Sequence, residues 1–263
     1  MPCFLPAKAD KNHPVKIRLD KLLVERHLAP TRERAQALIL AGRVLVNEQK
    51  LDKPGASILD DAHIRLLGGG LRYVSRGGLK LEAALAHWTI DLRDRFCLDV
   101  GASTGGFSDC MLQHGAARIL AIDTGYGQIA QSLRDDPRVT LMERTNARHL
   151  NPDDLPTGIS FIAVDVSFIS ATLLLPPLLQ AVCSGSEPSA APEAVVLIKP
   201  QFEAGREHVG KGGIVRDPAA HQLAIDRVRA CVEELRGTGI EVIDSPITGA
   251  EGNREFLLHA LWS

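Results

Sequence analysis

Residues 95–110 read RFCLDVGASTGGFSDC, and residues 117–123 read ARILAID. The first stretch joins an apolar segment to a glycine-rich turn and to a helical pattern that begins at residue 107. The second stretch is another apolar segment, and it ends in an acidic residue. Doubly wound α/β sheets are built from units in which a strand, a turn, a helix and a second strand follow one another. We therefore expect a parallel sheet in this part of the chain.

The chain beyond residue 123 repeats the same alternation of apolar segments and helical patterns. It predicts a Rossmann-like α/β sheet with helices on both faces. Strands are expected at 138–144, 160–169, 194–199, 239–246 and 254–262, and helices at 128–134, 171–182 and 218–236.

The glycine-rich turn has the pattern DxGxxxGG, with Asp99 followed by glycines at 101, 105 and 106. It matches neither the GxGxxG of dinucleotide-binding turns nor a phosphate loop that ends in GK[ST]. A carboxylate in this turn would repel a pyrophosphate but would favour a cofactor that carries a sulfonium and an ammonium group. Glycines can also serve close packing alone, so the interpretation depends on Asp123, which ends the next strand and can accept hydrogen bonds from ribose hydroxyls. This combination indicates S-adenosylmethionine.

Four charged residues stand at predicted strand ends or in the first helix of this part of the chain: Lys80, Asp165, Lys199 and Glu255. A lysine directly after four apolar residues, as at position 199, is costly to bury unless it is paired. A partly desolvated lysine beside another cation can lose its proton near neutral pH and act as a general base. Taken singly, each residue fits an ordinary surface ion pair equally well. Their joint placement favours methyl transfer to a ribose 2′-hydroxyl.

Methylation of exocyclic base amines commonly uses an Asn-Pro-Pro-aromatic turn. Asn151-Pro152 is the one Asn-Pro dipeptide in the chain, and Asp153 follows it. The sequence therefore does not support that reaction.

The composition, with 263 residues of which 45% are hydrophobic and 24% charged, is typical of one large globular domain or two. No segment of about 20 apolar residues is present to span a membrane. The best candidate, 161–182, is interrupted by Asp165 and by Pro176-Pro177. The first residues lack the apolar centre of a secretory signal.

The five cysteines, at positions 3, 97, 110, 183 and 231, are widely spaced and form no CxxC pair. Cys110 and His114 are four residues apart, but no second pair completes a zinc site. We therefore expect reduced thiols, no disulfide, no metal and a cytoplasmic protein.

The charge is distributed unevenly along the chain. Residues 1–80 hold 15 Lys and Arg against 8 Asp and Glu, whereas the remainder holds 15 against 24. A basic first third suggests a module that binds a polyanion, although a solvated basic face would give the same balance.

Inside the basic region, two short helical patterns precede a small set of strands. Thr31 can cap the second helix, and Gly42 suits the position after its end. Arg32 and Arg34 stand at the start of that helix, where side chains and free backbone N–H groups can bind phosphate. The expected elements are helices at 18–28 and 32–41, a strand pair at 44–51 and one further strand at 57–67.

Residues 18–55, RLDKLLVERHLAPTRERAQALILAGRVLVNEQKLDKPG, resemble the RNA-binding domain of the ribosomal protein S4 type. The resemblance implies a small α+β domain with RNA as its partner. Its scarcity of aromatic residues favours shape and phosphate contacts on folded RNA over base stacking.

Further segments extend the resemblance over most of the chain. They are YVSRGGLKLEAAL (73–85), LDVGASTGGFSDC (98–110), AIDTGYGQ (121–128), ERTNAR (143–148), VDVSFIS (164–170), LIKPQFEAGREHVGKGG (197–213) and GNREF (252–256). With residues 18–29 they resemble the TlyA family of hemolysin-named rRNA ribose methyltransferases, and the second part is similar to FtsJ-like ribose methyltransferases. The expected division is an extension at 1–15, an S4-like domain at 16–67, a linker at 68–75 and a methyltransferase domain at 76–263.

This resemblance implies S-adenosylmethionine-dependent methylation of cytidine 2′-hydroxyls in large-subunit rRNA, and in some members also in small-subunit rRNA. It implies a catalytic tetrad of Lys80, Asp165, Lys199 and Glu255. Cofactor contacts are implied for Asp99, Gly101, Ala102, Ser103, Thr104, Gly105, Gly106, Phe107, Asp123, Asn146 and Asp165. RNA contacts are implied for Arg18, Arg32, Arg34, Arg43, Arg206 and Lys211. The partner is ribosomal RNA in subunits or their precursors, and the oligomeric state is left open.

Two other functions fit the sequence less well. A hemolysin needs an amphipathic or membrane-spanning element, which the sequence lacks. A ribosome-assembly factor that only binds RNA would not need the tetrad, yet all four residues are present.

Overall fold

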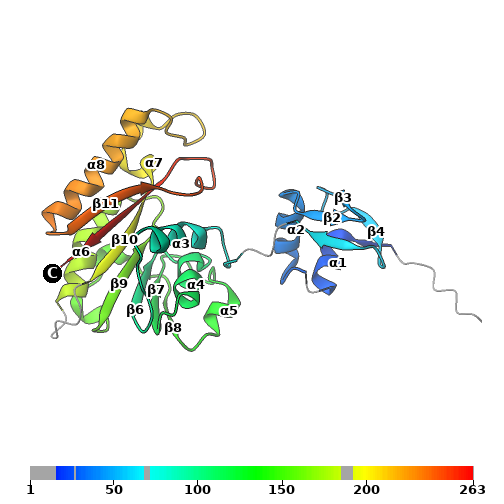
Figure 1. Cartoon of the computed structure of the whole chain (residues 1–263), viewed down its shortest axis with the longest axis horizontal. Coiled ribbons are helices and arrows are strands. Elements are labelled where there is room, and N and C mark those ends of the chain that lie inside the picture. The colour runs from blue at the N-terminus through cyan, green and yellow to red at the C-terminus, as the bar shows by residue number, and fades with distance from the viewer. Residues whose placement is uncertain (1–15, 27, 68–71, 185–191, 263) are drawn as a thin grey trace, which may run out of the picture. The chain divides into compact units, whose positions relative to one another are not determined.

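The computed structural model describes residues 16–26, 28–67, 72–184 and 192–262. The chain forms two compact units, and the boundary between them follows residue 70 (Figure 1). The predicted extension at 1–15 and residues 68–71 of the predicted linker lie outside the described residues, so that finer division stays a prediction.

The first unit packs two helices against short antiparallel strands around a small apolar core. Thr31 accepts a hydrogen bond from the Arg34 backbone N–H at 3.2 Å, which caps the second helix as the sequence predicts. Gly42, at φ +63°, follows the end of that helix in the left-handed region. The elements are β1 (Lys16–Arg18), α1 (Leu19–Glu25), α2 (Arg32–Leu40), β2 (Val44–Val46), β3 (Gln49–Lys50), β4 (Ser57–Leu59) and β5 (Ile64–Leu66).

Two predictions for this unit are wrong in detail. The helix expected at 18–28 is shorter, because residue 18 belongs to β1, which pairs with β4. The single strand expected at 57–67 is two strands: β4 pairs with β1, whereas β5 pairs with β2. Adjacent aspartates at 60 and 61 favour the turn that separates them.

The second unit is built on a seven-stranded sheet in the order β11-β12-β10-β9-β6-β7-β8. The five strands from β10 to β8 are parallel, and β12 is antiparallel to both of its neighbours. The strand expected at 160–169 ends earlier, at residue 164. The strands are β6 (Phe96–Val100), β7 (Arg118–Ile122), β8 (Val139–Met142), β9 (Ile159–Val164), β10 (Glu193–Ile198), β11 (Thr238–Asp244) and β12 (Phe256–Leu261).

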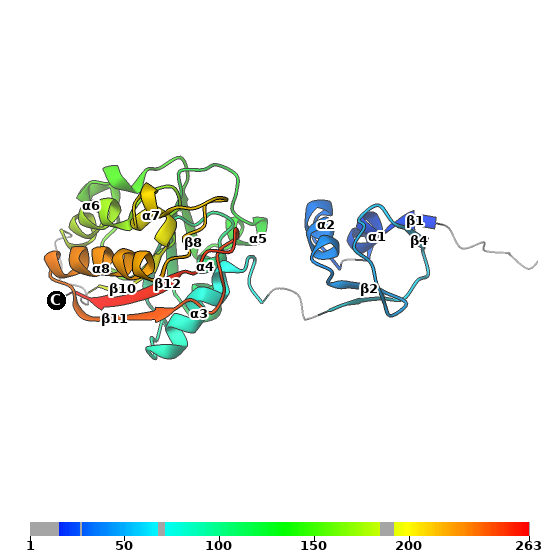
Figure 2. The same ribbon diagram turned by 90° about the horizontal axis from the view of Figure 1, so that it is seen from above.

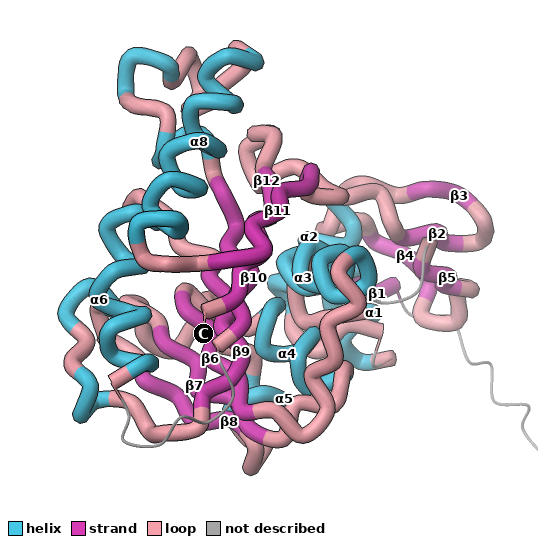
Figure 3. Tube along the Cα trace, turned by 60° about the vertical axis from the view of Figure 1, so that its left-hand side comes forward, coloured by secondary structure: helices cyan, strands magenta, loops and turns pink. Residues whose placement is uncertain are grey.

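Helices cover both faces of this sheet, as predicted. Helices α6 and α8 lie on one side of the sheet, and α3 and α4 lie on the other (Figures 2 and 3). Side chains of α6 and α8 pack in one core, and those of α3 and α4 pack in a second core. The helices are α3 (Gly77–His87), α4 (Gly106–Gln113), α5 (Gln131–Arg134), α6 (Ala171–Cys183), α7 (Pro200–Glu203) and α8 (Pro218–Glu234), with short 3₁₀ turns at Ala147–His149, Pro152–Asp154 and Arg206–His208.

Helix α6 continues through Pro176 and Pro177, which have no backbone N–H to donate. Pro176 therefore leaves the carbonyl of Thr172 without its usual partner four residues on. The Cys231 thiol of α8 donates to that carbonyl at 3.7 Å. A thiol of the neighbouring helix α8 thus replaces the backbone donor that Pro176 lacks.

None of the helices in the described part of the chain combines the length and the apolar character needed to cross a membrane.

Candidate active site

The site forms where the strand order reverses. The chain passes from β6 to β7 on one side and later returns to β9 on the other side of β6, so ligands are expected at the carboxyl ends of β6 and β9. Gly101 directly follows β6 at φ +88°, and a Cβ there would lie 2.3 Å from the Asp165 carbonyl oxygen. Only glycine permits the two strand ends to approach so closely.

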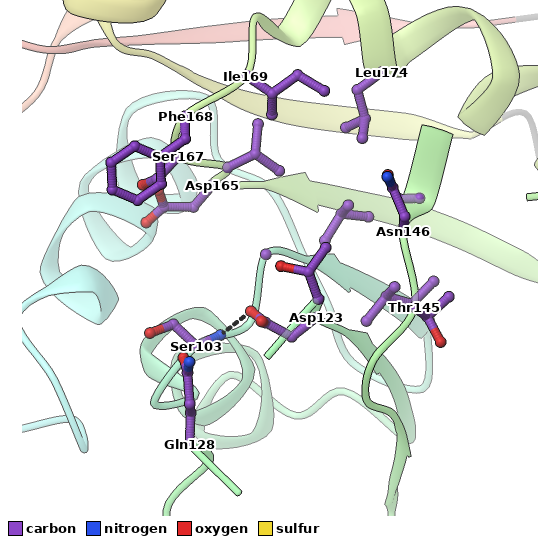
Figure 4. A pocket seen from close by; sticks show the side chains of 16 residues that line it. Ser103, Asp123, Gln128, Thr145, Asn146, Asp165, Ser167, Phe168, Ile169 and Leu174 are labelled. Carbon is purple, nitrogen blue, oxygen red and sulfur yellow. Dashed lines mark hydrogen bonds between the residues drawn. The ribbon is translucent and has the colours of Figure 1, made fainter. Parts of the chain in front are cut away.

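A cavity of about 290 Å³ opens at this point (Figure 4). Among the residues expected to bind the cofactor, it is lined by Gly101, Ser103, Asp123, Asn146 and Asp165. The sequence reasoning missed other lining residues, although several belong to motifs it singled out. These are Val100, Ile122, Thr124, Gln128, Thr145, Ala147, Val166, Ser167, Phe168, Ile169 and Leu174.

Asp123 follows β7 and is fixed by backbone donors. Its Oδ2 accepts from the Ser103 N–H at 2.7 Å, and its Oδ1 accepts from the Gly125 N–H at 2.6 Å. The first of these bonds ties the glycine-rich turn to the end of β7 (Figure 4). Asn146, on the segment after β8, accepts through its side-chain oxygen from the Arg148 N–H at 3.1 Å. The cavity thus has a rigid polar rim with spare oxygen acceptors.

The remaining residues of the predicted cofactor loop do not line this cavity. Asp99 is fully buried inside β6, where side chains alternate between the faces, and it accepts a hydrogen bond from Ser108 of α4 at 2.5 Å. A Cβ on Gly106 would lie 2.2 Å from Ser75 Oγ, so this glycine permits the close packing of α4 against the start of α3. Ala102, Gly105 and Phe107 are buried, and Thr104 is exposed.

Two buried lysines each pair with one carboxylate. Lys199 directly follows β10, and its Nζ lies 2.6 Å from Asp165 Oδ1 in an ion pair that lacks hydrogen-bond geometry. The same Nζ donates a hydrogen bond to Ser167 Oγ at 2.8 Å. Lys80 of α3 donates to Glu255 Oε2 at 2.5 Å. Burial of lone charges is expensive, so this pairing explains how both lysines are accommodated.

Strand register brings the two pairs to one edge of the sheet. Ile198 of β10 pairs with Phe256 of β12. Because the two strands are antiparallel, Lys199 and Glu255 are the next two residues to face each other beyond that pair. Asp165 follows β9, the other neighbour of β10. A Cβ on Gly77, at the start of α3, would lie 4.0 Å from Asp165 Oδ2, which places the first turn of α3 beside this cluster.

A second cavity of about 630 Å³ shares part of its wall with the first. Phe168, 92% exposed and at φ +66°, stands at the junction and contacts Phe202 with ring centroids 5.6 Å apart. Arg148 and Arg206 also line it. A groove with one exposed and one half-buried aromatic ring and two arginines suits a base and its phosphates. Lys211 is exposed but does not line this groove.

In the first unit, two of the predicted RNA-binding arginines form ion pairs with the buried Asp20. It accepts from Arg18 Nε at 3.0 Å and from Arg32 Nε at 3.0 Å. Arg34 lies in the first turn of α2, and Arg43 donates to the Leu67 carbonyl at 3.1 Å.

Within the described residues, no group of three or more His, Cys, Asp and Glu side chains is arranged to hold a metal ion.

The sheet order and the cavity at its switch point define a methyltransferase of the Rossmann-like class. The FtsJ-like methyltransferase family matches residues 73–261, and the S4 domain family matches residues 17–60. The chain belongs to the FtsJ-like methyltransferases and, among them, to the TlyA family, whose members carry an S4 domain.

Three similar proteins are informative. The candidate rRNA methyltransferase YqxC of Bacillus subtilis is 50% identical over 94% of this chain and 86% of its own. The 16S/23S rRNA (cytidine-2′-O)-methyltransferase TlyA of Mycobacterium tuberculosis is 41% identical over 92% and 89%. A solved structure from Streptococcus thermophilus, described as a candidate hemolysin, is 43% identical with a TM-score of 0.73 over 95% and 89%.

Proposed function

We propose that this enzyme transfers a methyl group from S-adenosylmethionine to the 2′-hydroxyl of cytidine in ribosomal RNA. The proposed target is 23S rRNA, with 16S rRNA as a second target to be tested. The observation that carries the proposal is the convergence of the Lys199–Asp165 and Lys80–Glu255 pairs beside the cavity at the switch point. The name of the M. tuberculosis relative supports the choice of nucleotide.

The residues around the cavity fit S-adenosylmethionine. Asp123 offers carboxylate oxygens to ribose hydroxyls, and Asp165 offers negative charge to a cationic cofactor. Ile122, Ile169 and Leu174 provide apolar surface for a purine ring. When bound, the cofactor supplies an electrophilic methyl group on a positively charged sulfur.

Lys199 is the proposed base. In its neutral form the amine removes the proton from the ribose 2′-hydroxyl, which is a poor nucleophile until that proton is gone. The ammonium formed in this way is the species that Asp165 stabilises at 2.6 Å. Glu255 holds Lys80 in the same neighbourhood, so once Lys199 has taken the proton the two lysines balance the two carboxylates.

The second cavity is the proposed site of the target nucleoside. Phe168 offers an exposed ring to the base, and Arg206 and Arg148 can contact adjacent phosphates. The proposed RNA contacts of the first unit, made by Arg18, Arg32, Arg34 and Arg43, then bind phosphates of the folded RNA. An enzyme with this substrate would work in the cytoplasm.

The experiment that tests the proposal is mass mapping of ribose methyl groups on 16S and 23S rRNA from cells with and without the protein. We expect a cytidine 2′-O-methyl group in 23S rRNA that is absent without the protein and reappears when purified enzyme and cofactor are added to the unmodified subunits. A methyl group on a base, or no difference in either rRNA, would contradict the proposal. Unchanged methylation with altered subunit assembly would favour a factor that only binds RNA.

A further inference from the structure

We infer that Ser167 is a positioning residue for the Lys199 amine. This inference rests on the proposed function, because it assigns Ser167 a role in proton removal by Lys199. Ser167 stands two residues after Asp165, on the wall that both cavities share.

The contacts of the lysine single out the serine. Lys199 Nζ lies close to two oxygens, Asp165 Oδ1 at 2.6 Å and Ser167 Oγ at 2.8 Å. The contact with Asp165 is a charge contact without hydrogen-bond geometry, whereas the contact with Ser167 is a hydrogen bond. A carboxylate at this angle attracts the nitrogen without fixing its direction, because charge attraction varies little with angle. The serine oxygen is therefore the group that directs one N–H bond.

Direction matters for a base. A neutral amine has one lone pair, and proton transfer requires this lone pair to point at the hydroxyl within hydrogen-bond reach. A lysine side chain rotates freely about several bonds, so each fixed N–H bond removes unproductive orientations. Ser167 and Asp165 both line the cavity at the switch point, so the two contacts of Nζ lie at the edge of that cavity.

The backbone around Ser167 is held at both ends. The Asp165 N–H donates to the Val100 carbonyl at 2.9 Å. At the other end, Glu203 accepts from Ser170 Oγ at 2.5 Å and from the Ala171 N–H at 2.7 Å. Glu203 lies in α7, directly after Lys199 in the chain. Two hydrogen bonds thus join the end of the loop that carries Ser167 to the helix that follows Lys199, so the backbone at Ser167 is anchored beside that of Lys199.

The test measures single-turnover methyl transfer and KM for RNA with the full-length enzyme and unmodified ribosomal subunits. Ser167→Ala removes the acceptor, Ser167→Cys keeps a similar volume with a weak acceptor, and Ser167→Thr keeps the hydroxyl. We expect the first two to lower the rate about 10- to 100-fold, as loss of a hydrogen bond to a charged group would, with much smaller changes in KM and cofactor affinity and with the melting temperature unchanged. Ser167→Thr should recover most of the rate, and the control Ser184→Ala should match the wild type.

The double variant Ser167→Ala/Lys199→Ala separates positioning from a structural role. Because Ser167 acts through Lys199, replacing the serine should not lower the methyl-transfer rate any further once the lysine is absent. A wild-type rate in Ser167→Ala, or an equal loss in both backgrounds, would overturn this inference and leave the proposed function standing. No transfer by the wild-type enzyme would overturn the proposed function and this inference with it.

Discussion

Asp99 is a carboxylate that the fold buries without a counter-ion. One of its oxygens accepts from Ser108, and the other has no partner. Burial, together with the negative charges of Asp165 and Asp123, raises the pKa of Asp99 to about 7, and the Ser108 hydrogen bond opposes this only in part. At pH 6 the folded protein therefore keeps this group largely protonated.

The raised pKa makes a prediction about stability. Between about pH 4 and pH 7 the folded state holds a proton on Asp99 that the unfolded state releases. The free energy of unfolding of the wild type therefore falls as the pH rises through that window. Asp99→Asn cannot ionise. We expect its free energy of unfolding, relative to the wild type, to rise from pH 4 to pH 7 and then to level off, as measured by urea denaturation.

Asp91→Asn is the matched control, because the Arg93 guanidinium holds the pKa of exposed Asp91 at about 2. The free energy of unfolding of Asp91→Asn, relative to the wild type, should change only below about pH 4, and there it should fall as the pH rises. A flat difference curve for Asp99→Asn between pH 4 and pH 7 would show that Asp99 is already ionised there.

At the scale of the element, the start of α2 combines free backbone N–H groups with two arginines. Arg32 is half exposed and is held by buried Asp20, which also holds Arg18. The hydrogen bonds from these two guanidinium groups hold the pKa of Asp20 well below its usual range. A fixed guanidinium loses less conformational entropy on binding phosphate than a free one.

We therefore predict that Arg32→Ala/Arg34→Ala weakens rRNA binding and flattens its salt dependence. Each lost phosphate contact should lower the slope of log K against log salt by about 1. Filter binding from low to moderate salt measures this slope. Arg93→Ala, in the second unit, removes an exposed arginine paired with Asp91 and should leave the slope unchanged. An unchanged slope in the double variant would exclude phosphate contacts at the start of α2.

At the scale of the whole molecule, the two units have separate apolar cores. Both tryptophans, Trp88 and Trp262, lie in the second unit, so tryptophan fluorescence reports only on the methyltransferase part. The first unit buries much less apolar surface and should be the less stable of the two.

Urea unfolding should consequently depend on the probe. We predict that far-UV circular dichroism, which detects helices in both units, begins to change at lower urea than tryptophan fluorescence does. Coincident transitions by the two probes would show that the units unfold as one.

The fold of the second unit and part of its site could be predicted from the sequence. Local patterns gave the sheet with helices on both faces, the cap at Thr31 and the strand-end position of Lys199. They could not give the register of β10 on β12, which sets Glu255 across from Lys199, because those residues are 56 apart in the chain. Side-chain contacts of Asp20 and Ser167 likewise depend on tertiary packing. Asp99 belongs to a recognised motif, yet the alternation along β6 turns it away from the cavity.

Methyl transfer by Lys199→Ala decides whether Lys199 removes the proton from the ribose hydroxyl. Single-turnover transfer to unmodified ribosomal subunits and binding to the same subunits should be measured side by side. A lost general base predicts that transfer falls by about 10²- to 10⁴-fold, while subunit binding stays within about twofold of the wild type. Wild-type transfer by this variant would contradict the account.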